Sequence, residues 1–562
     1  MRKKEALQRT VLAAAALLVC DAWGIELETD NPDWSVRFDN TVNASAKIRT
    51  QGADPALKDS FRLLQPGNPA SAFPQALNSN AGDQNFQKSG FVSERVDLLS
   101  EFDAVYRKDF GVRFSAAGWY DAALHRSTQA DRDPTIGQNP YNQFPAYTKT
   151  IAGADAELLD AFAFGGWRFD NGMKLTARLG QHGLVWGETL FFGDNGIARA
   201  QGPIDIDKLQ ASPNAQFKEI IRPVPQISGQ LSLSPAVSIG AYYQFQWERD
   251  RLPPSGSYFS ASNIPWGSQQ PEFSNFPGVG NFALSPRGDT NGKNSGQFGT
   301  QLKWRVEETD LGFYYAQYND KGGQLYGQLN PFGQPGPSGA LPGLWYYVFP
   351  NDIKTAGMSA SHSFGDFNVA AEGSVRNNMP LVNTNMFYGF FPGQPAPTFA
   401  TGKTAHLNLS TLATFGPSFI AKESSLVAEI AWNRLLSKDD PNNTIDPGRT
   451  RDASALQFVF TPSYRQAMPG LDLSIPVGVR YGLSGASSVT LWDTKGVGSV
   501  NVGIQGNYLN TWQFAITYTH YVGSAIPFVD YTPLLTGGIP ILGHGNALAD
   551  RNYVALSVRR SF

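Results

Sequence analysis

The side chains most suggestive of chemistry lie in the segment LGQHGLVWGETLFF, where His182, Trp186 and Glu188 are close together in the sequence. A histidine near a carboxylate could act in acid–base catalysis or bind a metal. A metal site needs about three ligands at suitable spacing, and three such ligands are not visible here. We therefore predict a hydrogen-bonded structural cluster, with no metal site and no cofactor site.

Known catalytic motifs are missing from the rest of the sequence. It has no Gly-x-Ser-x-Gly elbow, and its six histidines are mostly far apart, without a recognisable Ser/His/Asp order. The single cysteine, Cys20, excludes a disulfide scaffold and a cysteine metal cluster. A net charge of −3 gives no basic field for nucleic acid. We predict a protein that is not an enzyme, has no catalytic residues and binds no nucleic acid.

The same region is the best candidate for a pore constriction. Segment 184–224 opens with Trp186, Glu188, Phe191 and Phe192 and is too long for a tight turn. Long ordered loops are usually functional. These aromatic rings either form an apolar contact strip for a solute or only pack the loop against a wall. We predict that the loop folds into a lumen, with two basic residues of the wall available to pair with Glu188, namely Arg178 and Arg305.

The elements that must position this loop are strands. Charged residues make up only 17% of the chain and aromatic residues 12%, and no apolar run after the first 20 residues could form a transmembrane helix. From Val237 to Glu248, apolar and polar side chains alternate strictly, with Ile239, Tyr243 and Trp247 on one face. Such a period of two predicts a strand and excludes an amphipathic helix.

The N-terminus predicts export. Basic residues, the apolar run Val11 to Val19, and the small residues Ala22 and Gly24 together form a secretory signal peptide at residues 1–24. A buried N-terminal helix is the alternative. Val19 before Cys20 argues against a lipoprotein. The expected mature chain, 25–562, then contains no cysteine, which is typical of a bacterial envelope protein.

Long and short connections alternate along the chain. Short ones carry turn residues, as in Asp170-Asn171-Gly172, whereas long ones are rich in Gly, Pro, Asn and Ser. This alternation is typical of an outer-membrane barrel and unusual for a soluble β-sandwich. We predict one all-β, antiparallel, closed transmembrane β-barrel of about 18 strands (range 16–20), at 34–49, 91–106, 111–124, 154–169, 173–183, 225–233, 236–248, 296–306, 311–319, 352–364, 366–376, 403–414, 424–434, 452–463, 473–484, 497–508, 511–521 and 551–562.

The faces of these strands predict a polar lumen inside an apolar wall. Nine basic and nine acidic residues lie on the polar faces, so the lumen has no net preference for charge. Most of them are expected to pair and brace the wall. The residues predicted to line the lumen are Arg95, Glu101, Arg113, Tyr242, Gln244, Gln246, Glu248, Lys303 and Glu372.

The apolar faces should contact outer-membrane lipids. Aromatic rings near strand ends are predicted to form two interfacial belts, made of Tyr106, Tyr120, Tyr243, Trp247, Trp304, Trp432, Tyr508 and Trp512. The last strand ends in Phe562, which is similar to the signal that the barrel-assembly machinery reads in outer-membrane proteins. An even number of strands places both termini in the periplasm of a Gram-negative cell.

Several sequence blocks resemble a family of large proteobacterial outer-membrane β-barrel proteins, domain-of-unknown-function family 1302. They are LGQHGLVWGETLFF, IDIDKL, FKEIIRPVPQI, YYQFQWERDRLPPSGSYFS, VFPNDIKTAGMS and AAEGSVRNNMPL. The resemblance covers about Trp34 to Phe562, although Gln201–Asp205 departs from the usual turn. It implies a transport role beside a periplasmic lipoprotein-sorting-like companion and an inner-membrane exporter, often among pathways for apolar compounds. It supplies no catalytic residues.

We therefore predict an outer-membrane channel for small hydrophobic or amphipathic molecules, acting in uptake or efflux. The first alternative is a polar, substrate-specific porin, although such porins usually show a basic ladder that this lumen lacks. The second is a surface adhesin or an envelope-assembly partner that uses the nine outer loops.

Overall fold

The protein is described from a computed structural model. It covers residues 25–27, 29, 31–58, 75–76, 80–130, 142–212, 217–262, 272–276, 280–330, 334, 341–383, 387–388, 393, 395–443, 445–530 and 541–562. The predicted signal peptide, 1–24, lies outside the described residues.

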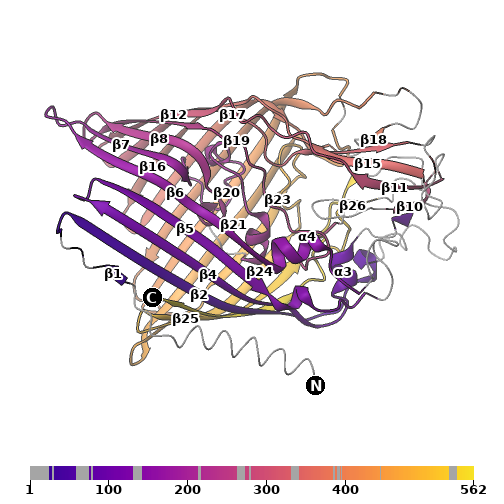
Figure 1. The fold of residues 1–562 in the computed structure, drawn as a ribbon, viewed down its shortest axis with the longest axis horizontal. Helices are drawn as coiled ribbons and strands as arrows, with labels where there is room; N and C mark the ends of the chain where they lie inside the picture. The colour runs from indigo at the N-terminus through magenta and orange to yellow at the C-terminus, as the bar shows by residue number, and fades with distance from the viewer. Residues whose placement is uncertain are drawn as a thin grey trace.

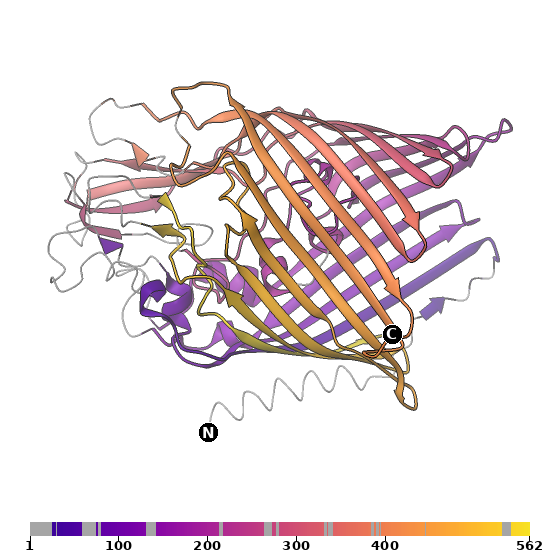
Figure 2. The same ribbon diagram turned by 180° about the vertical axis from the view of Figure 1, so that it is seen from behind.

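The molecule is a closed antiparallel barrel of eighteen strands (Figures 1 and 2). Its first strand pairs with its last, so the sheet has no open edge. This confirms the predicted fold and strand number. Around the barrel the strands are β2 (Trp34–Arg49), β4 (Gly90–Tyr106), β5 (Phe110–Asp121), β6 (Ala154–Arg168), β7 (Lys174–His182), β8 (Val224–Ser232), β9 (Val237–Gln244), β12 (Gln297–Val306), β13 (Thr309–Tyr318), β16 (Ile353–Phe364), β17 (Phe367–Pro380), β19 (Thr401–Phe415), β20 (Glu423–Lys438), β21 (Asp452–Met468), β22 and β23 (Leu471–Ser474 and Val477–Ser484, two halves of one strand), β24 (Gly498–Tyr508), β25 (Trp512–Val522) and β28 (Tyr553–Ser561). A short strand, β1 (Ile25–Leu27), pairs with β2.

The long connections build a second layer at one end of the barrel. There, six short strands form a sheet in the order β18 (Phe387–Tyr388), β14 (Gln324–Leu329), β15 (Leu341–Val348), β11 (Gly280–Pro286), β10 (Glu272–Phe276) and β3 (Gln75–Ala76). The pair β26 (Val529–Asp530) and β27 (Ile541–Leu542) lies at the same end (Figure 1). Sequence periodicity did not predict this sheet, because its strands are short and lie within Gly- and Pro-rich loops.

In the part of the chain that the structure describes, the helical segments are all short. They are α2 (Pro55–Lys58), α3 (Ala81–Asn85), η2 (Ala122–His125), α4 (Ala146–Thr148), η3 (Lys149–Gly153), η4 (Ile197–Ala200), α5 (Ile206–Ala211) and α6 (Phe217–Ile220). Within the described ranges, no helix has the length and apolar character needed to cross a membrane. The last three of these segments belong to the connection between β7 and β8, which enters the barrel.

Side chains alternate across the wall as the period of two predicts. On β9, Ile239 and Tyr243 point outward and are exposed, whereas Tyr242 and Gln244 point inward and are buried. The outer face is apolar on other strands too, as Leu179, Ile504 and others show. In a bilayer this outer face would contact lipid, and most polar groups of the backbone are paired within the sheet.

Several predicted belt residues occupy the outer face. Tyr120, Tyr243, Trp304 and Tyr508 are exposed there, and Tyr106, Trp432 and Trp512 are partly exposed. The placement of Trp247 is wrong. β9 ends at Gln244, and the chain then turns into the loop layer, where the Trp247 indole is buried, donates to the Asp320 carbonyl at 2.9 Å and packs on Phe349.

A charge placed on the outer wall should destabilise the barrel. We expect Ile239→Arg to lower the free energy of unfolding in lipid by about 2–4 kcal/mol, because a guanidinium on the lipid-facing side of the wall is poorly solvated. Chemical unfolding in liposomes, followed by tryptophan fluorescence, measures this change. Ser238→Arg, on the lumen face of the same strand, should have a much smaller effect. Equal losses for the two variants would contradict the assignment of faces.

Candidate functional site: the in-folded loop and the lumen cavity

The connection between β7 and β8 leaves the wall and crosses the barrel. We call residues 183–223 the in-folded loop. In Figures 1 and 2 its magenta ribbon lies inside the barrel. It starts at the end of β7 and binds β17, β19 and β20. β20 lies eight strands from β7 in a wall of eighteen, so the loop reaches nearly the opposite side of the lumen.

The main anchor of the loop is the carboxylate of Glu429 on β20. Its Oε2 accepts three consecutive backbone N–H groups, from Leu190 at 3.1 Å, Phe191 at 2.5 Å and Phe192 at 2.9 Å. Its Oε1 accepts the Asn408 amide at 2.7 Å. Only 1% of Glu429 is exposed. Successive N–H groups that converge on one oxygen form a concave anion site, here filled by the protein's own carboxylate.

A second carboxylate, that of Glu372 on β17, binds the loop on either side of this anchor. It accepts the N–H of Glu188 at 2.6 Å and that of Ile197 at 2.6 Å. Gly187 has φ +93°, and a Cβ there would lie 2.1 Å from Glu372 Oε2. Glycine is therefore required both for the backbone conformation and for the close approach of the carboxylate. This explains the glycine of the Trp-Gly-Glu block.

Polar side chains complete the docking of the loop. Asn195 donates to the Asn408 side chain at 2.8 Å and accepts from Asn433 at 3.2 Å. It also lies 2.9 Å from Nδ1 of His406. Arg376 donates to the carbonyls of residues 194 and 196 at 3.0 and 2.9 Å. Buried polar groups of the wall thus find partners on the loop, which fixes one position for it.

The aromatic side chains of the loop are packed against the wall. Trp186 contacts Tyr242 edge-on with ring centroids 4.9 Å apart. Phe191 and Phe192 pack near small residues of β20 and β21, and Phe192 contacts Trp492. These three rings are buried, so their role is to pack the loop against the wall. They do not form an exposed contact strip for a solute.

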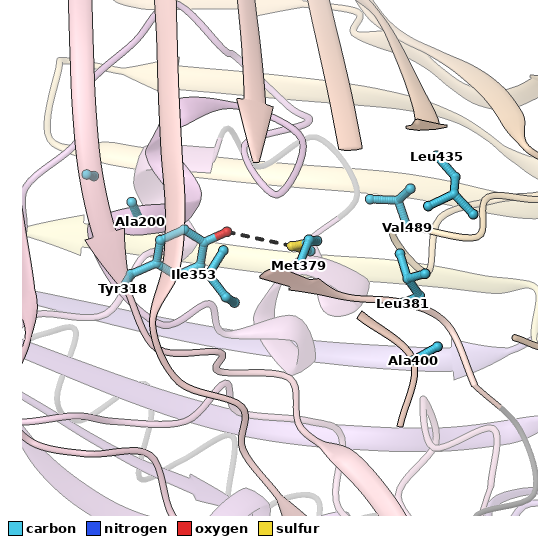
Figure 3. Close-up of a cluster of buried hydrophobic side chains, with 9 residues drawn as sticks. Ala200, Tyr318, Ile353, Met379, Leu381, Ala400, Leu435 and Val489 are labelled. Carbon is cyan, nitrogen blue, oxygen red and sulfur yellow. Dashed lines mark hydrogen bonds between the residues drawn. The ribbon is translucent and has the colours of Figure 1, made fainter. Parts of the chain in front are cut away.

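The turn that follows is held near the mouth of the barrel. Ala200, at the end of η4, belongs to a buried apolar cluster with Tyr318, Ile353 and Met379 (Figure 3). Arg199 forms a bidentate pair with Asp250, with both N–O distances 2.9 Å. The loop is therefore bound both to the wall and to the neighbouring long connections.

Glu188 does not pair with either of the predicted arginines. Its nearest cation is Lys303, at 3.8 Å. Arg305 pairs with its directly opposite ladder neighbour Asp310 at 2.6 Å, near the short-turn end. Arg178 lies over the ring of Phe162. The expected pairing is wrong because each arginine has a closer partner on its own wall. Burial raises the pKa of Glu188, and Lys303 partly opposes this shift.

A cavity of about 1120 Å³ remains beside the loop. Its walls come from strands at both ends of the chain and from the α5–α6 part of the loop. Apolar groups such as Leu124, Ile220 and Phe259 line it together with charged groups such as Arg95 and Asp207. Seven basic and eight acidic side chains line it, so its charges nearly balance. A smaller cavity of about 500 Å³ lies by Arg178 and Trp186.

Most charged groups around the larger cavity are paired. Arg251 bonds both Glu157 and Asp205. The guanidinium groups of Arg95 and Arg251 lie 5.1 and 5.6 Å from the centroid of the Trp119 ring. An aromatic face beside balanced charges suits a solute with both apolar and polar parts.

The remaining predicted lumen residues are distributed along the wall. Glu101 and Arg113 form an ion pair. Gln244 is buried beneath the loop and donates to the Gln201 carbonyl at 2.6 Å. Gln246 and Glu248 were expected within a strand. They instead follow the end of β9, where Gln246 is exposed and donates to Glu248 at 2.6 Å.

His182 is part of a hydrogen-bonded cluster. Its Nε2 lies 2.7 Å from the Ser228 hydroxyl and its Nδ1 lies 3.0 Å from the Gly180 carbonyl. Among the described residues, no group of three or more His, Cys, Asp or Glu side chains could hold a metal ion. Neither Trp186 nor Glu188 contacts the ring nitrogens of His182.

Glu429 was not identified from the sequence. The signal available was weak: a single acid on the inner face of a strand that is otherwise apolar or uncharged around it, in LVAEIAWN. Nothing in the sequence relates it to three N–H groups about 240 residues earlier. Only the closed barrel brings them together.

The sequence was compared with protein families, curated proteins and solved structures. The model of the family described as "Protein of unknown function (DUF1302)" matches residues 6–562. The chain belongs to this family. No curated protein matches it.

Several solved structures are similar to this chain over most of its length. OccAB2 of Acinetobacter baumannii is 8% identical, with 94% of this chain and 98% of that chain covered and a TM-score of 0.40. The outer membrane channel DcaP of the same organism is 8% identical, with 96% and 100% covered and a TM-score of 0.36. OccK2 (OpdF) of Pseudomonas aeruginosa, solved with glucuronate, is 9% identical, with 94% and 97% covered and a TM-score of 0.34. The likeness between these structures and this chain concerns the fold alone.

Weakening the main anchor should release the loop. We expect Glu429→Gln to speed hydrogen exchange at the amides of residues 190–192 by roughly tenfold, because hydrogen bonds to a charged acceptor are stronger by about 1.5 kcal/mol. Mass spectrometry of the purified barrel measures the exchange. Glu423→Gln, an exposed position on the same strand, is the matched control and should leave these amides unchanged. Unaltered exchange in Glu429→Gln would show that the carboxylate is not the anchor.

The cavity should change its ion preference with pH. Burial, and secondly the neighbouring Asp205, raise the pKa of Asp207 to about 6, although Arg95 and Lys47 oppose this shift. As the pH rises through 6, Asp207 becomes charged, so the cation-to-anion permeability ratio should rise roughly twofold. Reversal potentials in a salt gradient from pH 4.5 to 7.5 measure this ratio. Asp207→Asn should remove the rise, and a pH profile identical to the wild type would refute the assignment.

Proposed function

We propose that the protein is a channel of the Gram-negative outer membrane for small hydrophobic or amphipathic molecules. The observation that carries the proposal is the cavity beside the in-folded loop, where apolar and aromatic groups lie together with a nearly balanced set of charges. A closed barrel with an apolar outer wall is built to sit in a bilayer. Its lumen then offers a route through that bilayer.

The balance of charges distinguishes this proposal from a polar, charge-selective porin. A pore for anions needs a surplus of unpaired Arg and Lys along its path. Here four of the five arginines that line the cavity are bound to acids, as Arg251 is to Glu157 and Asp205. A solute without net charge meets no large electrostatic barrier in such a lumen. A charged solute finds few unpaired opposite charges to attract it.

The orientation of the barrel and its partners are part of the proposal. We place the short turns and both termini in the periplasm, since short periplasmic turns and long outer loops are the rule for these barrels. The strand that ends in Phe562 would then be presented to the barrel-assembly machinery. A periplasmic lipoprotein-sorting-like companion and an inner-membrane exporter would meet the barrel at this end. We assign it no enzymatic activity.

Liposome permeation tests the proposal. Vesicles that contain the protein should admit neutral amphipathic solutes faster than anions or cations of equal size. Replacing residues 188–205 with a short Gly-Ser linker should raise single-channel conductance and reduce discrimination between solutes, because Glu372 and Glu429 would then face water. Heat-modifiable mobility on gels verifies that the variant is folded. A folded variant with unchanged conductance, or faster permeation of charged solutes, would contradict the proposal.

A further inference from the structure

The barrel wall contains two prolines at one level. The strand made of β22 and β23 is interrupted at Ile475 and Pro476, and its neighbour β21 carries Pro462. Ser463 faces Ser474 and Phe460 faces Val477 in the ladder, so Pro462 lies opposite Ile475. The same argument on the other side, with β24, places Pro476 opposite Gly503.

Each proline removes one hydrogen bond from the ladder. The Ile475 N–H donates to the Pro462 carbonyl at 3.0 Å, and the reciprocal bond of this pair would need an N–H on Pro462. The Gly503 N–H donates to the Pro476 carbonyl at 3.0 Å, and its reciprocal bond would need an N–H on Pro476. Proline has no N–H. The ladder therefore supplies no donor to the carbonyls of Ile475 and Gly503. One missing bond lies between β21 and the β22–β23 strand, and the other lies between that strand and β24.

These missing bonds lie next to the lumen cavity. Ser463, Ser474 and Gln505, which adjoin the two proline pairs, line the cavity. On the outer face at this level, Ile504 is exposed. The missing bonds therefore lie in a part of the wall that has the cavity on one side and the exposed outer face on the other.

A membrane barrel normally avoids this arrangement. Unpaired backbone groups in the bilayer core are costly, and proline within a sheet is usually confined to edges or bulges. Separating two strands at a level that already lacks ladder bonds breaks fewer bonds than anywhere with a complete ladder. Below this level, Arg465 and Asp472 are paired at 3.1 Å and join the strands near their turn. An opening would therefore be local.

We propose that this level of the wall, in the ladder between β21 and the strand made of β22 and β23, is a lateral seam through which an apolar solute passes from the lumen cavity into the bilayer. The inference rests on the proposed function and deepens it, since it gives the solute a second path besides the axis of the barrel. An apolar solute gains from entering lipid directly instead of water. Ions would keep to the aqueous lumen.

A disulfide across the seam tests the proposal. Ser463 and Ser474 form a non-hydrogen-bonded pair that faces the cavity, where Cα atoms lie about 4.5 Å apart and a disulfide is feasible. Ser45 and Ser557 form the same kind of Ser–Ser pair, also facing the cavity, in the ladder between β2 and β28. The double variants S463C/S474C and S45C/S557C are thus matched, and only the first locks the seam.

The probe is N-phenyl-1-naphthylamine, whose fluorescence rises when it enters lipid, added to Gram-negative cells that produce the protein. We expect the wild type to speed uptake above that of cells without it. In cells with oxidised S463C/S474C, this increase in uptake rate should be at least fivefold smaller than with the wild type. Dithiothreitol should restore it. Oxidised S45C/S557C should show the full increase. Single-channel conductance should be unchanged in both. Wild-type uptake in oxidised S463C/S474C would overturn the seam.

A readout that needs no solute separates the seam from the channel proposal. Amides of residues 473–478 should exchange hydrogen at least tenfold faster than those of residues 41–46, where the ladders of β2 with β4 and with β28 are both regular. P462A/P476A, which restores both donors, should slow this exchange. Equal exchange in the two segments would overturn the seam even if the channel carries apolar solutes. If the wild type fails to speed uptake, the channel proposal is contradicted. The hydrogen-exchange comparison then still tests whether the seam opens.

Discussion

The architecture of the lumen depends on two buried carboxylates that hold a loop by its backbone. Glu372 and Glu429 stand on the inner wall and together accept five N–H groups of the in-folded loop. A buried charge is tolerated only when it is fully hydrogen-bonded, and these N–H groups provide that compensation. The loop N–H groups satisfy the buried carboxylates of the wall, and the carboxylates in turn satisfy these N–H groups of the loop. The cavity exists because the loop is held in this one position.

The rest of the loop follows from this constraint. With the backbone fixed at residues 188–197, Trp186, Phe191 and Phe192 face the wall. The small residues Ala431 and Ala455 leave room for the two phenylalanine rings, and Trp186 packs against Tyr242. The α5–α6 part then borders the cavity, with Asp205 paired to Arg251 and Asp207 near Arg95 of β4 and Lys47 of β2. A loop tied only by exposed ion pairs would be much less defined.

The wall could be predicted from the sequence, and much of the loop's docking could not. Alternation is a local property, so the strands around Ile239 and Val500 and the total of eighteen were predictable. Trp247 was misplaced because the alternation continues after the strand ends at Gln244, and only a tertiary contact with Asp320 marks that end. The length and apolar opening of segment 184–224 indicated an in-folded loop. Its anchors could not be predicted, because Glu429 meets its partners only after the barrel closes.

The position of these anchors along the chain has a consequence for assembly. The loop is synthesised directly after β7, whereas Glu372 and Glu429 belong to strands made much later. Until β17 and β20 are in place, the N–H groups of residues 188–197 and their aromatic neighbours have no docking surface. Loop closure across about 240 residues must therefore precede docking, which makes this step late and dependent on the strands up to β20. A barrel that lacks these strands would hold an undocked in-folded loop, so docking of the loop reports that β17 and β20 are in place.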